Sequence, residues 1–240
     1  MRHNRLMLSI YRKRRLIIAV IFFAVSVFTV INNTPSGNKP DLTENKNVLG
    51  TSLNGGNLAI DALKLITIKG RAPKTDYTRE QFGNGWATVK GCDTRNIILN
   101  RDLQNVIVNE KCEVVSGILD DPYSGKIIDF NRGDTTSGDV QIDHVVALSD
   151  AWQKGAQLLS KEQRVALAND PLELLAVDGP TNIQKSDGDA ATWLPPNKAF
   201  RCEYVARQIA VKQKYSLWMT QAEYDSISKI LNKCSSQKMP

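Results

Sequence analysis

A basic cluster followed at once by an apolar run opens this chain of 240 residues. Arg12 to Arg15 are four consecutive cations, and only Ser26 and Thr29 interrupt the apolar side chains of residues 16–31. This order is typical of an export signal and places the following chain outside the membrane. The run is slightly short for a membrane helix, which needs about 20 residues, and no clean small-residue cleavage site follows it. The sequence predicts a secreted or cell-surface protein, with residues 1–31 either a cleaved signal peptide or a retained membrane anchor.

An exported chain folds in an oxidising compartment, so its cysteines are candidates for disulfide bonds. They are Cys92, Cys112, Cys202 and Cys234. Of the three possible pairings we expect Cys92–Cys112 and Cys202–Cys234, because each closes a local loop and contributes about 3 kcal/mol. Zinc binding is the competing interpretation, but no two cysteines are close in sequence and His144 is the only histidine beyond the apolar run. Two disulfides are the prediction.

The net charge of +6 does not by itself indicate nucleic-acid binding. Six of the 31 Lys and Arg residues lie within residues 1–31, and the remaining 25 balance the 25 acidic residues. Affinity for nucleic acid must therefore come from local patches and a bound metal ion. Residues 198–240 carry eight bases against three acids, which suits a surface beside a phosphate backbone and equally suits a solvated helix face.

The rest of the chain divides into a linker and one domain. Residues 32–57 hold seven asparagines and few large apolar side chains, so we expect a flexible linker before a domain at 58–240. Periodicity and turn residues predict the following order. A short helix near 58–66 comes first, followed by strands and loops over 77–139. A strand is expected at 140–146, then helix over 148–168 with a break near Gly155, then a strand at 172–177. Two helical segments over 199–232 end the domain. In the last segment Thr220 is the expected N-cap and Glu223 is expected to complete a capping box.

His144 follows Asp143 at the end of the predicted strand 140–146. A second strand, a tight turn, and then Asn182 and Lys185 follow downstream, which is the order of a ββα-metal site. Imidazole, with an unperturbed pKa of ~6.5, can accept a proton from water near neutral pH. The side-chain oxygens of Asp143 and Asn182 suit one divalent ion, Mg²⁺ or Mn²⁺, and a lysine can bind phosphate as a point charge.

Residues 143–148 and 182–187 resemble the HNH endonuclease superfamily, most closely the GmrSD-type C-terminal HNH domain found in secreted bacterial proteins. The resemblance covers roughly residues 59–234. Further matching segments are Gly91 to Asn96, Asp121 to Tyr123, Ala151 to Ala156, Ala168 to Pro171, Trp193 to Pro196, and Cys202 to Val205.

The resemblance implies a role for each residue of the motif. His144 would be the general base, Asp143 and Asn182 metal ligands, and Lys185 a residue near the scissile phosphate. Glu173 stands where the family usually has an asparagine that ties the loop carrying the catalytic histidine. A glutamate there could still accept a backbone N–H or could weaken activity. Ala147 replaces a frequent proline.

Four further residues have two interpretations each. Arg95 would either bind the phosphate with its planar fork or form a salt bridge. Asp187 and Asp189 would complete the metal shell or cap a helix, and capping is favoured. Trp193 is expected to be a packing residue rather than a platform for bases.

The sequence thus predicts an α+β domain with a ββα-metal (HNH/His-Me finger) core, added helices and two disulfides. It is expected to hydrolyse DNA, with RNA as the second candidate, with little sequence preference and with no protein partner inferred. Its only other predicted partner is the membrane, if residues 1–31 are uncleaved. Two alternatives remain: a non-catalytic envelope-binding module on a degenerate HNH fold, and a phosphodiesterase acting on a small or cell-wall phosphate ester.

Overall fold

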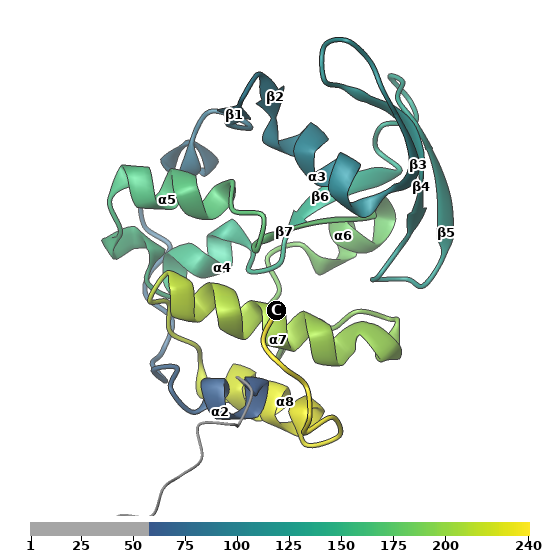
Figure 1. The fold of residues 1–240 in the computed structure, drawn as a ribbon. Coiled ribbons are helices and arrows are strands. Elements are labelled where there is room, and N and C mark those ends of the chain that lie inside the picture. The colour runs from purple at the N-terminus through teal and green to yellow at the C-terminus, as the bar shows by residue number, and fades with distance from the viewer. Residues whose placement is uncertain (1–57) are drawn as a thin grey trace, which may run out of the picture. The chain divides into compact units, whose positions relative to one another are not determined.

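The computed structural model describes residues 58–240 (Figure 1). The predicted signal or anchor at 1–31 and the predicted linker at 32–57 lie outside the described residues. Within residues 58–240, no helix is both long enough and apolar enough to cross a membrane.

A pair of antiparallel strands carries the predicted motif. Strand β6 (Val140–His144) pairs with β7 (Leu174–Asp178), and His144 lies opposite Leu174. Helix α6 (Gly179–Lys185) starts directly after β7, because the Asp178 side chain accepts the Thr181 N–H and Pro180 stands in the first turn. Two strands and a helix therefore occur in the predicted order, with other helices inserted between the strands.

A three-stranded antiparallel sheet lies beside this pair, in the order β3 (Gln104–Val108), β4 (Val114–Asp120) and β5 (Ile127–Asn131). Helix α3 (Thr94–Asp102) packs between the two sheets (Figure 1). Its buried Ile98 and Leu99 join one apolar cluster with Phe130 of β5, Ile142 of β6 and Leu174 of β7. The short strands β1 (Thr88–Val89) and β2 (Cys92–Asp93) precede α3.

Helices make up most of the remaining domain. Between β6 and β7 lie α4 (Leu148–Gln153), the 3-10 turn η2 (Ala156–Leu158) and α5 (Lys161–Ala168), while η1 (Arg79–Phe82) packs on α5. After α6 come η3 (Lys198–Phe200), α7 (Arg201–Lys214) and α8 (Gln221–Leu231), and α2 (Ala59–Leu63) packs against the last two helices.

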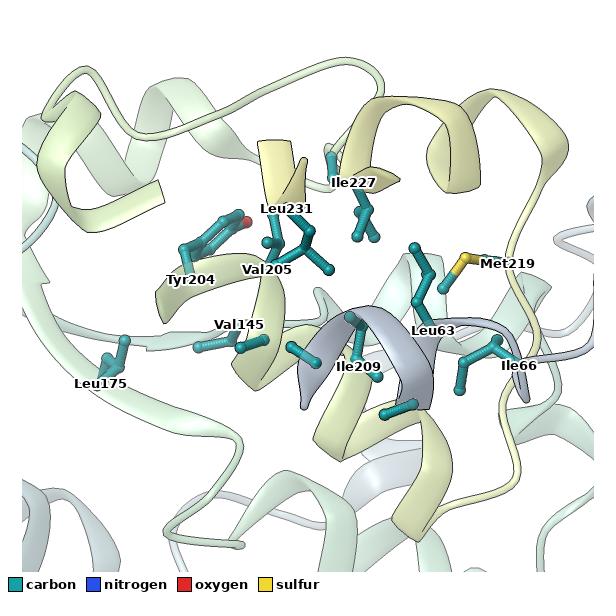
Figure 2. Packing of buried hydrophobic residues seen from close by; sticks show 14 of the residues in the cluster. Leu63, Ile66, Val145, Leu175, Tyr204, Val205, Ile209, Met219, Ile227 and Leu231 are labelled. Atoms are coloured by element: carbon teal, nitrogen blue, oxygen red, sulfur yellow. The ribbon is translucent and has the colours of Figure 1, made fainter. Parts of the chain in front are cut away.

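The largest apolar cluster joins these helices to the strand pair (Figure 2). Val205 and Ile209 of α7 are fully buried beside Leu63 of α2. Val145, directly after β6, and Leu175 of β7 belong to the same cluster. Burial of each such side chain contributes about 1.5–3 kcal/mol to the stability of the fold. These contacts hold the strand pair against α7.

Both predicted disulfides are present. Cys92 is bonded to Cys112, and Cys202 is bonded to Cys234, with Cα atoms 5.4 Å and 6.4 Å apart respectively. No cysteine is free, so the four sulfurs cannot form a zinc site. The first disulfide ties β2 to the turn before β4, and the second ties α7 to the segment after α8.

The sequence analysis was wrong about two local features. Helix α3 lies inside residues 77–139, where only strands and loops were expected; Asp93 caps it by accepting the Asn96 N–H. Thr220 is the N-cap of α8, as predicted, but Glu223 does not complete a capping box. The Glu223 carboxylate is fully buried and pairs with lysines instead.

Those lysines belong to a charge cluster formed by three cations and three carboxylates, which is buried except for Arg71 at its exposed edge. Its members are Arg71, Lys154, Lys212, Asp150, Asp189 and Glu223. The Lys154 Nζ lies 2.6–2.8 Å from an oxygen of each carboxylate and is fully buried. The charges balance, which is what allows them to be buried. The cluster joins α4, α7 and α8 to the segment after α6.

Candidate functional site

A cavity of about 560 Å³ opens beside β6 and α6. Its wall includes Arg79, Trp86, Arg95, Gln141, Asp143, His144, Asn182 and Asp187. Gln141 and Asp143 share one face of β6, because side chains two apart on a strand point the same way. Asn182 comes from α6, so the strand pair and the helix bring the predicted residues His144, Asp143 and Asn182 to one cavity.

His144 is held as a neutral imidazole with one nitrogen available. Its Nε2 lies 3.0 Å from the backbone oxygen of Ala168. A carbonyl oxygen only accepts, so Nε2 carries the hydrogen and Nδ1 keeps its lone pair. Burial lowers the pKa of His144 to about 3, so the ring is uncharged at neutral pH. The indole of Trp86 stacks on the imidazole at 5.7 Å with an interplanar angle of 9°, which fixes the ring further.

Both oxygens of Asp143 are occupied by hydrogen-bond donors from the interior. Lys185 Nζ donates to Oδ1 at 2.8 Å, and the hydroxyl of Tyr123 donates to Oδ2 at 2.5 Å. A carboxylate has about four lone-pair sites, so two remain for other ligands. The two donors fix the orientation of Asp143 at the cavity wall.

The side chain of Lys185 is turned into the interior of the domain. Its side chain is fully buried, and its Nζ also donates to the backbone oxygen of His144 at 2.8 Å. The ammonium therefore lies beneath the site, where it neutralises Asp143 and holds the end of β6. Lys185 is not among the residues of the cavity wall, and its expected position near the scissile phosphate stays a prediction.

Asn182 is half-buried and presents an oxygen to the cavity. Its Nδ2 donates to Oε1 of Gln141 at 3.0 Å. Among residues 58–240, its Oδ1 receives no hydrogen bond. An outer partner of this kind orients a ligand group before a metal binds. The hydrogen bond to Gln141 therefore holds the side-chain amide of Asn182 with its nitrogen toward Gln141 and its oxygen without a partner among the described residues.

Glu173 ties down the segment that follows His144. Its Oε2 accepts the Val146 N–H at 3.1 Å, and its backbone oxygen accepts the Val145 N–H at 2.8 Å. The side chain is fully buried, and burial raises the pKa of Glu173 well above its usual range, which favours the neutral acid. Of the two outcomes foreseen for this glutamate, the structure shows acceptance of a backbone N–H.

Two arginines contribute positive charge to the cavity wall. Arg95 is half-buried, and its Nη2 donates to the backbone oxygens of Ser137 at 3.1 Å and Val140 at 3.0 Å. It forms no salt bridge within the described part of the chain, so its other donors are available to an anion. Burial and the neighbouring Arg132 lower the pKa of Arg95, but a guanidinium stays charged near neutral pH. Arg79 lies exposed at the same wall.

The two aspartates after α6 have separate roles. Asp187 lines the cavity, accepts the Ser149 hydroxyl at 3.1 Å and pairs with Lys74 at 3.3 Å. Asp189 belongs to the buried charge cluster, and its carboxylate accepts the Ala191 N–H in a turn. The helix that these residues were expected to cap is not formed.

Trp193 is a packing residue, as predicted, with its ring centroid 5.1 Å from that of Tyr123. Four residues of the site were missed by the sequence analysis: Arg79, Trp86, Tyr123 and Gln141. Only Gln141 had a usable signal, since it stands two residues before Asp143 on the same strand face.

The oxygens at this wall fit a single hard divalent cation. Within residues 58–240 no three His, Cys, Asp or Glu side chains gather into a metal-binding group. Asp143 and the Oδ1 of Asn182 are side-chain oxygens at this wall that could hold such an ion. Mg²⁺ is commonly bound through one or two carboxylates and keeps several waters, so oxygens of this kind fit it.

Comparison with known proteins shows the family of this chain. The family described as "GmrSD restriction endonucleases, C-terminal domain" matches residues 93–230, more than half of the chain. An "Uncharacterized secreted protein" of Arthroderma benhamiae is 37% identical over 172 residues, covering 70% of this chain and 81% of that protein. No solved structure gives a significant match. The matched range includes Arg95, Asp143, His144, Asn182 and Lys185.

Proposed function

Because this chain belongs to the GmrSD restriction endonuclease C-terminal domain family, we propose that it is an exported, metal-dependent HNH endonuclease that hydrolyses phosphodiester bonds of DNA. The observation that carries the proposal is the placement of His144: its ring is fixed through Nε2, its Nδ1 has no partner among residues 58–240, and it lines the cavity that Asp143 and Asn182 also line.

His144 acts as the general base in this proposal. Nδ1 accepts a proton from a water that attacks the phosphorus opposite the leaving oxygen. The imidazole accepts this proton while Trp86 and the Ala168 carbonyl hold the ring in place. The ring therefore does not need to reorient during the step. Glu173 keeps the segment after His144 from moving.

Other residues bind the phosphate and the cation. Arg95 and Arg79 offer guanidinium donors to the non-bridging oxygens. Asp143 and Asn182 would hold the divalent ion, which, when bound, supplies Lewis-acid polarisation of the phosphate and stabilises the leaving oxygen. Lys185 offsets the charge of Asp143, which keeps the carboxylate in place when no substrate is bound.

We also propose that the protein acts outside the cell. Two disulfides favour an oxidising compartment, and the relative from Arthroderma benhamiae is described as secreted. Low sequence preference follows from the absence of a helix-turn-helix or zinc-finger reading element in the sequence. DNA is preferred to RNA as the proposed substrate.

Plasmid nicking by the purified, oxidised protein tests the proposal. The assay compares Mg²⁺, Mn²⁺ and EDTA, and it includes His144→Ala beside Leu158→Ala, a change at an exposed leucine. We expect metal-dependent nicking that falls by at least about 10²-fold in His144→Ala and is unchanged in Leu158→Ala. Equal activity in His144→Ala and wild type would contradict the assigned base.

The same preparation distinguishes the alternatives. Turnover of a small diester such as bis(p-nitrophenyl) phosphate without cleavage of DNA or RNA would favour a phosphodiesterase. No turnover of any of these substrates, with a folded protein that retains both disulfides, would favour the envelope-binding module.

A further inference from the structure

A second cavity, of about 180 Å³, adjoins the first. Its wall is formed by Arg79, Phe82, Gly83, Gly85, Trp86, His144, Leu148 and Ala168. Four of these residues also line the larger cavity: Arg79, Trp86, His144 and Leu148. The two cavities therefore meet at the side chain of the proposed general base.

The wall of the second cavity is mostly apolar and aromatic. Phe82 and Ala168 are buried, and the half-buried indole of Trp86 stands against His144. The one permanently charged side chain is Arg79, which forms no salt bridge within residues 58–240. Such a wall suits a planar, uncharged ring that is attached to an anionic group.

Two glycines lie in this wall. Gly83 and Gly85 have φ values of +109° and +93°, a region that disfavours any other residue. A cavity of 180 Å³ corresponds to about six waters at ~30 Å³ each, which is room for one nucleobase and too little for a base pair.

We propose that the second cavity binds the base of a nucleotide next to the scissile phosphate, so that the enzyme acts on single-stranded or locally unpaired nucleic acid. This inference rests on the proposed nuclease function. A phosphate at Asp143 and His144 places its neighbouring nucleoside beside His144, where the second cavity begins. A base within a duplex must first be extruded, which disfavours paired substrates. Aromatic walls bind all bases through their faces, in keeping with low sequence preference.

An abasic substrate tests the base site without altering the protein. The full chain, with Mn²⁺, is given a single-stranded oligonucleotide carrying one central abasic residue, and each cleaved bond is mapped on a sequencing gel. The matched control has the same sequence with a base at that position. We expect one of the two bonds flanking the abasic residue to be cut at least about 10-fold less than in the control, with distant bonds unchanged.

The outcomes separate this inference from the function it rests on. Equal cutting of both flanking bonds in the two oligonucleotides would overturn the base site and leave the nuclease proposal standing. No metal-dependent cleavage of any bond would overturn the nuclease proposal and the base site together.

A variant of Trp86 gives an independent test. Wild type is expected to cut a single-stranded oligonucleotide at least about 10-fold faster than the same sequence in a duplex. Trp86→Leu should narrow this ratio, while Trp86→Phe, which keeps an aromatic face, should retain most of it. If Trp86 only supported His144, Trp86→Leu would slow both substrates equally and leave the ratio unchanged, which would refute the base site.

Discussion

Glu173→Gln tests whether the glutamate behind His144 is a neutral acid. The substitution keeps the shape of the side chain and an oxygen that can accept the Val146 N–H. Glu173 is fully buried, and burial raises its pKa in the folded protein. In the unfolded chain an ordinary glutamate has a pKa of about 4.3. The two proteins should therefore differ in how their stability responds to pH.

The sign and size follow from proton linkage. Between about pH 4.3 and the raised folded-state pKa, the unfolded wild type releases a proton that the folded wild type keeps. The contribution of Glu173 to the free energy of unfolding of the wild type is therefore fully present at low pH. It falls as pH rises, by up to about 1.36 kcal/mol per pH unit. Glutamine binds no proton at this position. The free energy of unfolding of Glu173→Gln minus that of the wild type should therefore rise with pH at the rate at which the wild type loses stability. His144 titrates in both proteins, and its contribution cancels in the difference.

Urea unfolding of the oxidised proteins at pH 5, 6 and 7 measures this difference. The control is Glu203→Gln, the same chemical change at an exposed position of α7, and the pH response of Glu173→Gln should exceed that of this control. For Glu173→Gln each pH unit should change the ratio of unfolding constants by up to about tenfold. A difference that is constant from pH 5 to 7 would show that Glu173 is ionised in the folded protein and would refute the reasoning.

Three further predictions concern other parts of the domain. Asn182→Ala should weaken Mn²⁺ binding in calorimetry by at least about 10-fold, and an unchanged Kd would remove Asn182 from the ligand set. Arg95→Ala should raise KM for DNA and lower the slope of log KM against log salt by about 1, with kcat nearly unchanged; an unchanged slope would exclude a phosphate contact. Lys154→Met should cost about 3–5 kcal/mol in urea unfolding, because it leaves three carboxylates without their shared partner, and a loss below about 1 kcal/mol would contradict that role.

Local sequence signals predicted the features that depend on neighbours along the chain. Alternation located β6, the Asp178-Gly179-Pro180 turn located the start of α6, and the spacing of the cysteines favoured the two pairings that the structure shows. His144, Asp143 and Asn182 were identified together from the order of strand, turn and helix along the chain and from the resemblance to the HNH motif. Their catalytic and ligand roles stay a proposal.

Features that depend on distant partners were not predictable in the same way. The long side chain of Lys185 can reach a phosphate or turn inward, and only the position of Asp143 across the fold decides between them. Glu223 matched a capping box, but Lys154 and Lys212 compete for its carboxylate from other helices. Trp86 is brought to His144 by the packing of η1 and β1, and nothing in its local sequence indicates this.

The buried charge cluster also couples the walls of the cavity to the last helix of the domain. Its members come from positions as far apart as Arg71 and Glu223. Until α8 is available, the buried ammonium groups of Lys154 and Lys212 lack the carboxylate that they share, and burying them without it is costly. We therefore expect α4 and the segment after α6, which flank His144 and Asn182, to settle only when the last helix has been made.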